Sequence, residues 1–147
     1  MGKESDKFIV AIGKGLAELE RDFNASQTVI EEAVTIFSEW QMAEQSAAII
    51  LNDTYKGDED QADNDPKYKK LVDEAARLKP QAERVEQQSD RLIRLVDTNK
   101  RALLKLVGDF ETYVKQKEKS KNPFKKKSVG SSKKFIEATK KAINDLQ

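Results

Sequence analysis

A run of acidic residues between Gly57 and Pro66 is the part of the sequence whose residue types could hold a metal ion. The stretch 52–65 contains six Asp or Glu residues and one lysine, a local charge of −5. Such carboxylates bind Ca²⁺ when oxygen ligands alternate along a loop that also supplies a glycine and a closing glutamate, and Ala62 interrupts that order. The sequence therefore favours a solvated turn over a metal site, with docking onto a basic partner as the other alternative.

A lysine-rich segment lies near the C-terminus. Between 115 and 134 the chain has nine lysines and one glutamate, a local charge of +8. Lysines of this kind hold an anionic membrane surface at about 1 kcal/mol each, and a neighbouring aromatic ring can insert at the interface. The segment has no arginine and no series of aromatic residues, so nucleic-acid binding is not expected and a solvated linker is favoured. The residues of the alternative, an anionic-surface site, are Lys121, Phe124, Lys125, Lys126 and Lys127.

The residues that most enzymes use are missing. The chain has no cysteine and no histidine, which removes thiolate catalysis, cysteine-ligated metals and the commonest general base. Gly13-Lys14-Gly15 lacks the other residues of a phosphate-binding loop. The single tryptophan, Trp40, falls on an apolar seam and is expected in the core. The sequence therefore predicts a non-enzymatic protein with no cofactor, no metal and no small-molecule substrate.

The elements that carry these segments follow a seven-residue apolar pattern. In 9–51 and again in 68–117, apolar residues recur at alternating spacings of three and four. This pattern predicts two long, coiled-coil-like α-helices, at about 6–55 and 66–118, joined by an acidic tip at 52–65. The seam of the second helix consists of Tyr68, Leu71, Ala75, Leu78, Ala82, Val85, Ser89, Leu92, Val96, Asn99, Leu103, Leu106, Phe110, Tyr113 and Lys117.

Several local features of these helices leave alternatives open. Unbroken phase favours one continuous first helix over two helices divided at Asn24–Ser26, and a kinked but continuous second helix over one broken at Pro80. An antiparallel hairpin would pair seam residues whose numbers sum to about 119. Gly13, Gly15 and Gly108 would then fall near one level, which predicts a close backbone approach there.

The C-terminal part is expected to form separate elements. After a helical hairpin at 1–119, the composition predicts a basic linker at 120–131 and a short amphipathic helix at 132–147. So short a helix needs a surface to pack on. The first apolar run, Phe8–Ile12, is too short for a signal sequence or a membrane span, so a soluble protein, cytoplasmic by default, is expected.

Apolar residues beside the two seams predict a partner. Hairpins with stripes this wide are usually completed by further helices. We therefore predict an all-α antiparallel hairpin that acts as an adaptor, binding a helical protein or forming a homodimer, with a peripheral membrane protein as the alternative. The predicted partner-binding residues are Val29, Ile36, Phe37, Trp40, Ala43, Ile50, Val72 and Leu78.

Overall fold

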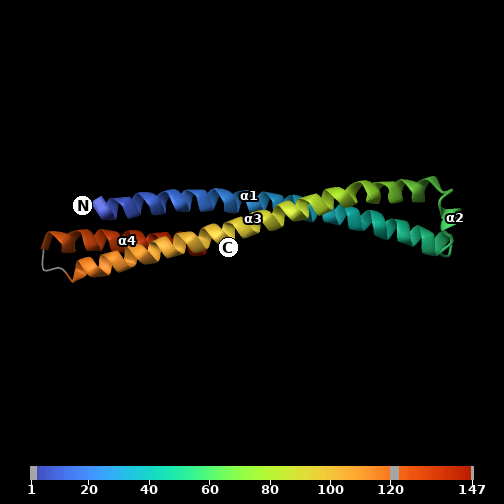
Figure 1. The fold of residues 1–147 in the computed structure, drawn as a ribbon. Helices are drawn as coiled ribbons and strands as arrows, with labels where there is room; N and C mark the ends of the chain where they lie inside the picture. The colour runs from blue at the N-terminus through green and yellow to red at the C-terminus, as the bar shows by residue number, and fades with distance from the viewer. Residues whose placement is uncertain (1–2, 120–122, 147) are drawn as a thin grey trace. The chain divides into compact units, whose positions relative to one another are not determined.

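The structure, a computed structural model, describes residues 3–119 and 123–146, except for the side chains of 123–128. It confirms the predicted all-α class. The elements in chain order are α1 (Lys3–Ile49), a π-helical turn (Ile50–Thr54), α2 (Glu59–Ala62), α3 (Pro66–Glu118) and α4 (Pro123–Asp145) (Figure 1).

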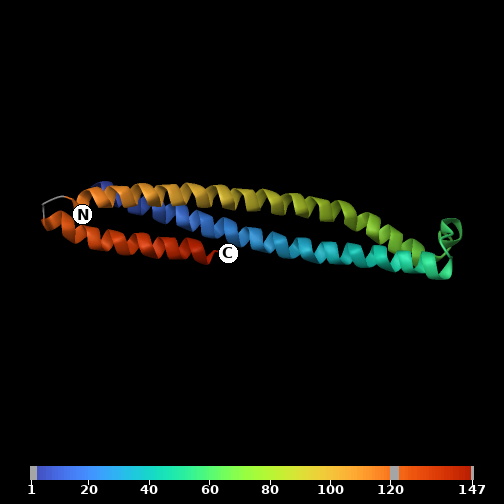
Figure 2. The ribbon, with the colours of Figure 1, turned by 90° about the horizontal axis from the view of Figure 1, so that it is seen from below.

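The two long helices, α1 and α3, run antiparallel and pack against each other (Figures 1 and 2). The ring of Phe8 stacks on that of Phe110 with centroids 5.0 Å apart. Asn99 Nδ2 donates a hydrogen bond to Asp22 Oδ2 at 2.9 Å. The paired residue numbers sum to 118 and 121, close to the predicted register. A half-buried seam asparagine with a specific acceptor helps to fix such a register.

The chain divides into two compact units, and each long helix contributes to both. Unit 1 comprises residues 1–25 and 92–147, and unit 2 comprises 26–91. α1 continues through Asn24–Ser26, and α3 continues through Pro80, so the predicted continuity of both helices is confirmed.

Unit 1 is a bundle of three helices in which α4 lies alongside α1 and α3 (Figures 1 and 2). Its core takes Ile12 from α1, Phe110 from α3 and Ile143 from α4, all 1% exposed or less. Phe110 contacts aromatic rings on both other helices, because it stacks on Phe8 and meets Phe135 edge-on at 6.3 Å. Aromatic pairs of this kind contribute about 0.5–1.5 kcal/mol each beyond the area they bury.

α4 begins earlier than the sequence pattern predicts. The helix starts at Pro123, and Gly130 is helical, so the predicted linker at 120–131 is wrong over 123–131. The reason is packing, since residues spaced by three and four extend the buried face of α4 towards its N-terminus. These buried residues are Val129, Ser132, Ile136, Thr139 and Ile143.

The predicted close approach at three glycines holds for one of them. A Cβ added to Gly15 would lie 3.1 Å from Leu103 Cδ1, so α3 does come close there. A Cβ at Gly13 or Gly108 would meet nothing within 4 Å, because both residues face solvent. The level of a glycine along the hairpin does not show which side of its helix that glycine lies on.

Unit 2 is a two-helix hairpin closed by an ordered tip. The helical chain stops after Tyr55 because Lys56 and Gly57 adopt φ values of 54° and 87°. The Gly57 N–H then donates to the Leu51 carbonyl at 2.9 Å, which satisfies a terminal backbone acceptor. Below the turn, Ala62 of α2 is fully buried in a cluster with Ala47 and Tyr68.

Asp65 ties the tip to the start of α3. Its Oδ1 accepts from the Lys67 N–H at 2.9 Å, and its Oδ2 accepts from the Tyr55 hydroxyl at 2.7 Å. The sequence Asp65-Pro66 is typical of a helix start, with Asp as the N-cap and Pro in the first turn, and the bond to the Lys67 N–H shows that Asp65 does cap α3. The Tyr55 hydroxyl, followed by the Lys67 N–H, holds the pKa of Asp65 below its ordinary value.

Replacing Phe110 by alanine should destabilise unit 1 by about 3–5 kcal/mol, because the ring is fully buried and leaves a cavity. Urea denaturation followed by circular dichroism at 222 nm measures this free energy of unfolding. Leu104→Ala is the control, since Leu104 lies on the same helix and is 42% exposed. Equal losses in the two variants would contradict the central role of Phe110.

The Asp65 bond predicts a pH dependence of stability. Since the pKa of Asp65 is lowered in the folded state, its contribution is complete above the unfolded-state pKa. That contribution is lost as the pH falls through the folded-state pKa. The stability difference between the wild type and Asp65→Asn should therefore shrink as the pH is lowered from about 6 to about 3. Asp63→Asn removes an exposed carboxylate of the same tip, and its difference from the wild type should change less over the same range.

Candidate interaction surface

The residues predicted to contact a partner all lie in unit 2, and the structure divides them into two groups. Leu78 and Ala43 are 2% and 5% exposed, and Ile50 packs against the tip cluster, so these three stabilise the hairpin. The other five remain in contact with solvent, Val72 being 38% exposed and the rest half-buried. They are Val29, Ile36, Phe37, Trp40 and Val72.

Trp40 differs from the other four residues because its side chain carries a polar N–H group. Its ring meets Phe37 edge-on with centroids 5.8 Å apart. Its Nε1 is shielded from solvent and has no hydrogen-bond partner within the part of the chain that the structure describes. A shielded donor without an acceptor costs about 1–3 kcal/mol. The local packing of unit 2 therefore retains an unpaired polar group beside half-buried apolar side chains.

Two hollows mark the surface of unit 2 next to these residues. The first, of about 340 Å³, lies along α1 and is lined by Thr28, Glu31, Glu32, Thr35 and Ile36. The second, of about 250 Å³, lies between α1 and α3 and is lined by Glu39, Met42, Ala43, Ser46, Leu71 and Glu74. We call the eleven residues that line the two hollows the acidic stripe.

The α1 residues of the acidic stripe form one continuous face. Positions 28, 32, 35, 39, 42 and 46 follow each other at spacings of four and three, which places them above one another on an α-helix. The apolar floor includes Met42, which is 67% exposed, and Leu71, which is half-buried. Ionisable residues in the two linings are the four glutamates, with no lysine or arginine among them.

Several residues of this surface are not among those predicted from the sequence. Glu39, Met42 and Glu74 are not among the predicted contact residues. The prediction was based on apolar residues in and beside the seam, and it did not include the polar and exposed residues that flank them. A second seven-residue periodicity, Thr28–Thr35–Met42, was the available signal. It mixes polar and apolar residues, and for that reason a search for apolar residues alone does not find it.

The other site considered from sequence, the anionic-surface site, falls outside the described part of the chain. Lys121 is not among the described residues. The backbone of 124–127 is helical, and the side chains of Phe124, Lys125, Lys126 and Lys127 lie outside the description. Membrane-surface binding therefore stays a prediction from sequence.

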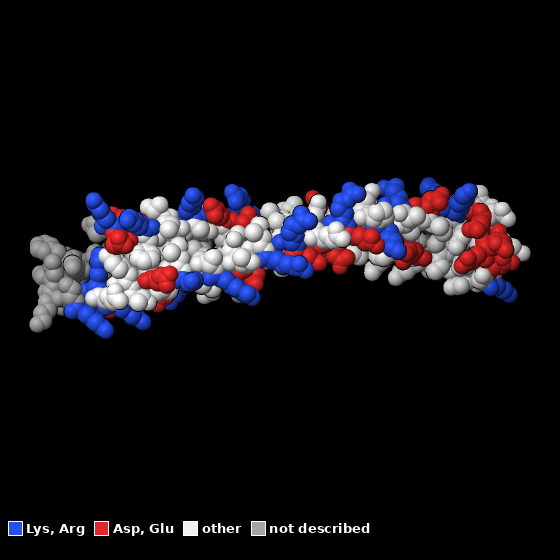
Figure 3. All heavy atoms as spheres, in the orientation of Figure 1, with Lys and Arg blue, Asp and Glu red and all other residues white. Residues whose placement is uncertain are grey.

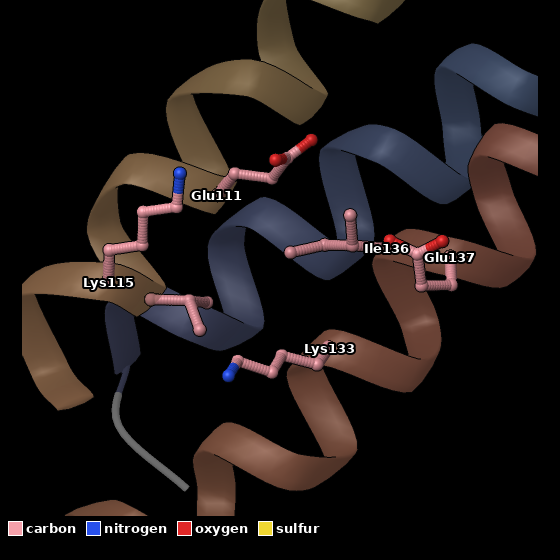
Figure 4. Close-up of a pocket in the computed structure, with 6 residues that line it drawn as sticks. Glu111, Lys115, Lys133, Ile136 and Glu137 are labelled. Carbon is pink, nitrogen blue, oxygen red and sulfur yellow. The ribbon is translucent and has the colours of Figure 1, made fainter.

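A third hollow, of about 200 Å³, lies between α3 and α4 in unit 1 (Figure 4). Lys115 and Glu111 reach it from α3, and Lys133 and Glu137 from α4. Two of these groups are held in ion pairs across the helices, Glu111 with Lys140 at 2.5 Å and Lys133 with Glu118. The bond to Glu111 raises the pKa of Lys140. These two ion pairs link α4 to α3.

No group of three or more carboxylates among the described residues is arranged to hold a metal ion. None of the described helices is long and apolar enough to cross a membrane. In the view of Figure 3, carboxylates gather at the α2 end of unit 2.

Comparisons of the chain with protein-family models, with curated proteins and with solved structures find no match.

Replacing Trp40 by phenylalanine should change the free energy of unfolding by less than about 1 kcal/mol, because the lost apolar area is offset by removal of an unpaired donor. Leu78→Ala, in contrast, should cost about 2–5 kcal/mol, since Leu78 is buried in the same hairpin. Urea denaturation of both variants gives the comparison. A loss above 2 kcal/mol for Trp40→Phe would show that the indole N–H is satisfied in solution.

Proposed function

We propose that this chain is a non-enzymatic interaction protein whose unit 2 receives an additional helix, supplied by another protein or by a second copy. The observation that carries the proposal is the contrast between the two units. In unit 1, α4 covers the α1–α3 pair and helps to bury Val107 and Val114, which are 1% and 2% exposed. Unit 2 contains the same two long helices, and between residues 26 and 91 the only other helical elements are the π-helical turn and the short α2 at the tip, so no third long helix covers the pair.

The apolar residues of unit 2 show the consequence. In unit 1, α1 buries Ile12 and Leu19 to 1% exposure, although Val10 on the same helix is 70% exposed. On the same helix in unit 2, Ile36, Phe37 and Trp40 are only half-buried. Met42 and Ile49 are 67% and 59% exposed. At about 25 cal/mol per Å² of apolar surface, a helix that covered such residues would gain several kcal/mol for every few hundred Å² buried.

The unpaired indole supports the same proposal. The Trp40 N–H has no acceptor among the described residues, although it is shielded from solvent. A tryptophan that offers an apolar ring and one donor is typical of the centre of a protein–protein interface.

Site-directed photocrosslinking in the native source would test the proposed function. Benzoylphenylalanine at Met42, on the exposed face of unit 2, should give one dominant adduct, whereas the same group at Gln116, an exposed position of unit 1, should not. Ile36→Glu in the Met42 crosslinking variant should reduce that adduct at least fivefold, because a buried, unpaired carboxylate is costly at an apolar contact.

Sedimentation equilibrium of the purified chain distinguishes a second copy from a different partner. A self-adduct at Met42 should come with a dimer that dissociates on dilution. A chain that stays monomeric at high concentration and gives no adduct at Met42 above the Gln116 control would rule the proposed function out.

A further inference from the structure

The charges around the acidic stripe define the chemistry of the helix that it fits. We infer that unit 2 binds a basic amphipathic helix, whose apolar face covers the stripe and whose lysines or arginines meet the glutamates on its rim. This inference rests on the proposed function and narrows it to one class of partner.

The lining of the stripe supplies the first argument. Its apolar residues are Ile36, Met42, Ala43 and Leu71, and its ionisable residues are Glu31, Glu32, Glu39 and Glu74. A helix laid along such a groove is anchored by side chains at spacings of three and four. The side chains that flank its apolar face then meet carboxylates on the rim. Lysine or arginine at those flanking positions would be attracted, and glutamate or aspartate would be repelled.

The charge of the surrounding unit supplies the second argument. Between Ser26 and Ile49, α1 has four glutamates and neither lysine nor arginine. Unit 2 as a whole has fifteen acidic and eight basic residues, a net charge of −7, whereas unit 1 has eleven acidic and nineteen basic residues, a net charge of +8. The near-neutral total of +1 therefore conceals strong segregation. A local field of this sign steers basic partners towards unit 2.

The same numbers argue against a symmetric homodimer formed by unit 2. Such a dimer would bring two surfaces of net charge −7 together, and like charges across an interface oppose association. A basic helix from another protein meets no such opposition.

α4 provides an internal example of the proposed geometry. It is itself a basic amphipathic helix, with seven lysines and two acidic residues between Pro123 and Asp145. Its apolar side, including Ile136 and Ile143, is buried against α1 and α3. Two of its lysines meet glutamates of α3, in the pairs Lys133–Glu118 and Lys140–Glu111. The α1–α3 pair thus already accepts one helix of this chemistry in unit 1.

The test uses the full chain and two synthetic helical peptides. One is a 21-residue amphipathic peptide of leucine and lysine, and the other has the same leucine pattern with glutamate in place of lysine. Because Trp40 is the only tryptophan and lies in unit 2, its fluorescence reports binding there. The lysine peptide should shift the emission saturably, with an affinity that falls as the salt concentration rises. The glutamate peptide should produce no saturable shift.

Two double variants with the same charge change separate the stripe from the general charge of unit 2. Glu39→Gln with Glu74→Gln neutralises two rim carboxylates, and it should weaken lysine-peptide binding about three- to thirtyfold, from two partly exposed ion pairs. Glu59→Gln with Asp60→Asn removes the same charge from α2 at the tip and should change the affinity less than twofold. Circular dichroism checks that both variants keep the helix content of the wild type.

The outcomes distinguish this inference from the proposed function. Equal binding of both peptides, or equal losses in the two double variants, overturns the basic-helix inference and leaves helix docking in place. A Met42 photocrosslink to an acidic helix or to a second copy would also overturn the basic-helix inference and leave helix docking in place. Failure of the lysine peptide to bind overturns the inference. If the Met42 photocrosslink is also absent, the proposed function fails with it.

Discussion

Two packed helices can bury only the stripe that each turns towards the other, and this limit governs the whole structure of the chain. The α1–α3 seam places residues at seven-residue spacing against each other, and it packs the two long helices within each unit. Any apolar residue beside the seam stays in contact with water unless another helix covers it. The two units differ chiefly in whether that helix is present.

Unit 1 meets the limit with large side chains and a third helix. Phe110 reaches rings of both neighbouring helices, and the core also includes Ile12, Val107 and Ile143. Unit 2, which has no such third helix, packs its two long helices mainly through small residues at the seam. Its buried positions are Ser26, Ala43, Ala47, Ala62, Tyr68, Ala75, Leu78, Ala82 and Ser89. Small residues let two helices lie close together, but they bury little apolar area, so the larger side chains remain half-buried at the sides of the hairpin.

Polar groups in the seam have specific tasks. Asn99 donates to Asp22, and Lys117 donates to the buried Ser5 hydroxyl while its ammonium lies 4.8 Å from the Tyr113 ring centroid. Each bond joins α1 to α3 and can form in one register only, which compensates for the low directional specificity of apolar contacts. The charges outside the seam are segregated by unit. A helix of the kind proposed to dock on unit 2 would therefore be selected by the sign of its charge as well as by its apolar face.

The sequence by itself determined the two long helices, their antiparallel register and the absence of histidine and cysteine chemistry. Helix periodicity extends over many turns, so each seam residue adds to one consistent signal. The cap at Asp65 was also predictable, because capping depends on residues close together in sequence.

The tertiary structure decided which side residues are covered, and by what. Val129 belongs to the buried face of α4 because α1 and α3 are there to receive it, which the glycine and serines around it conceal in the sequence. Ala62 is buried by the turn at Lys56 and Gly57, and a single alanine in the sequence gives no signal that predicts this burial. The acidic stripe was missed for the same reason. Glu39 and Glu74 lie far apart in sequence, and only the packing of α1 on α3 places both at the rim of one hollow.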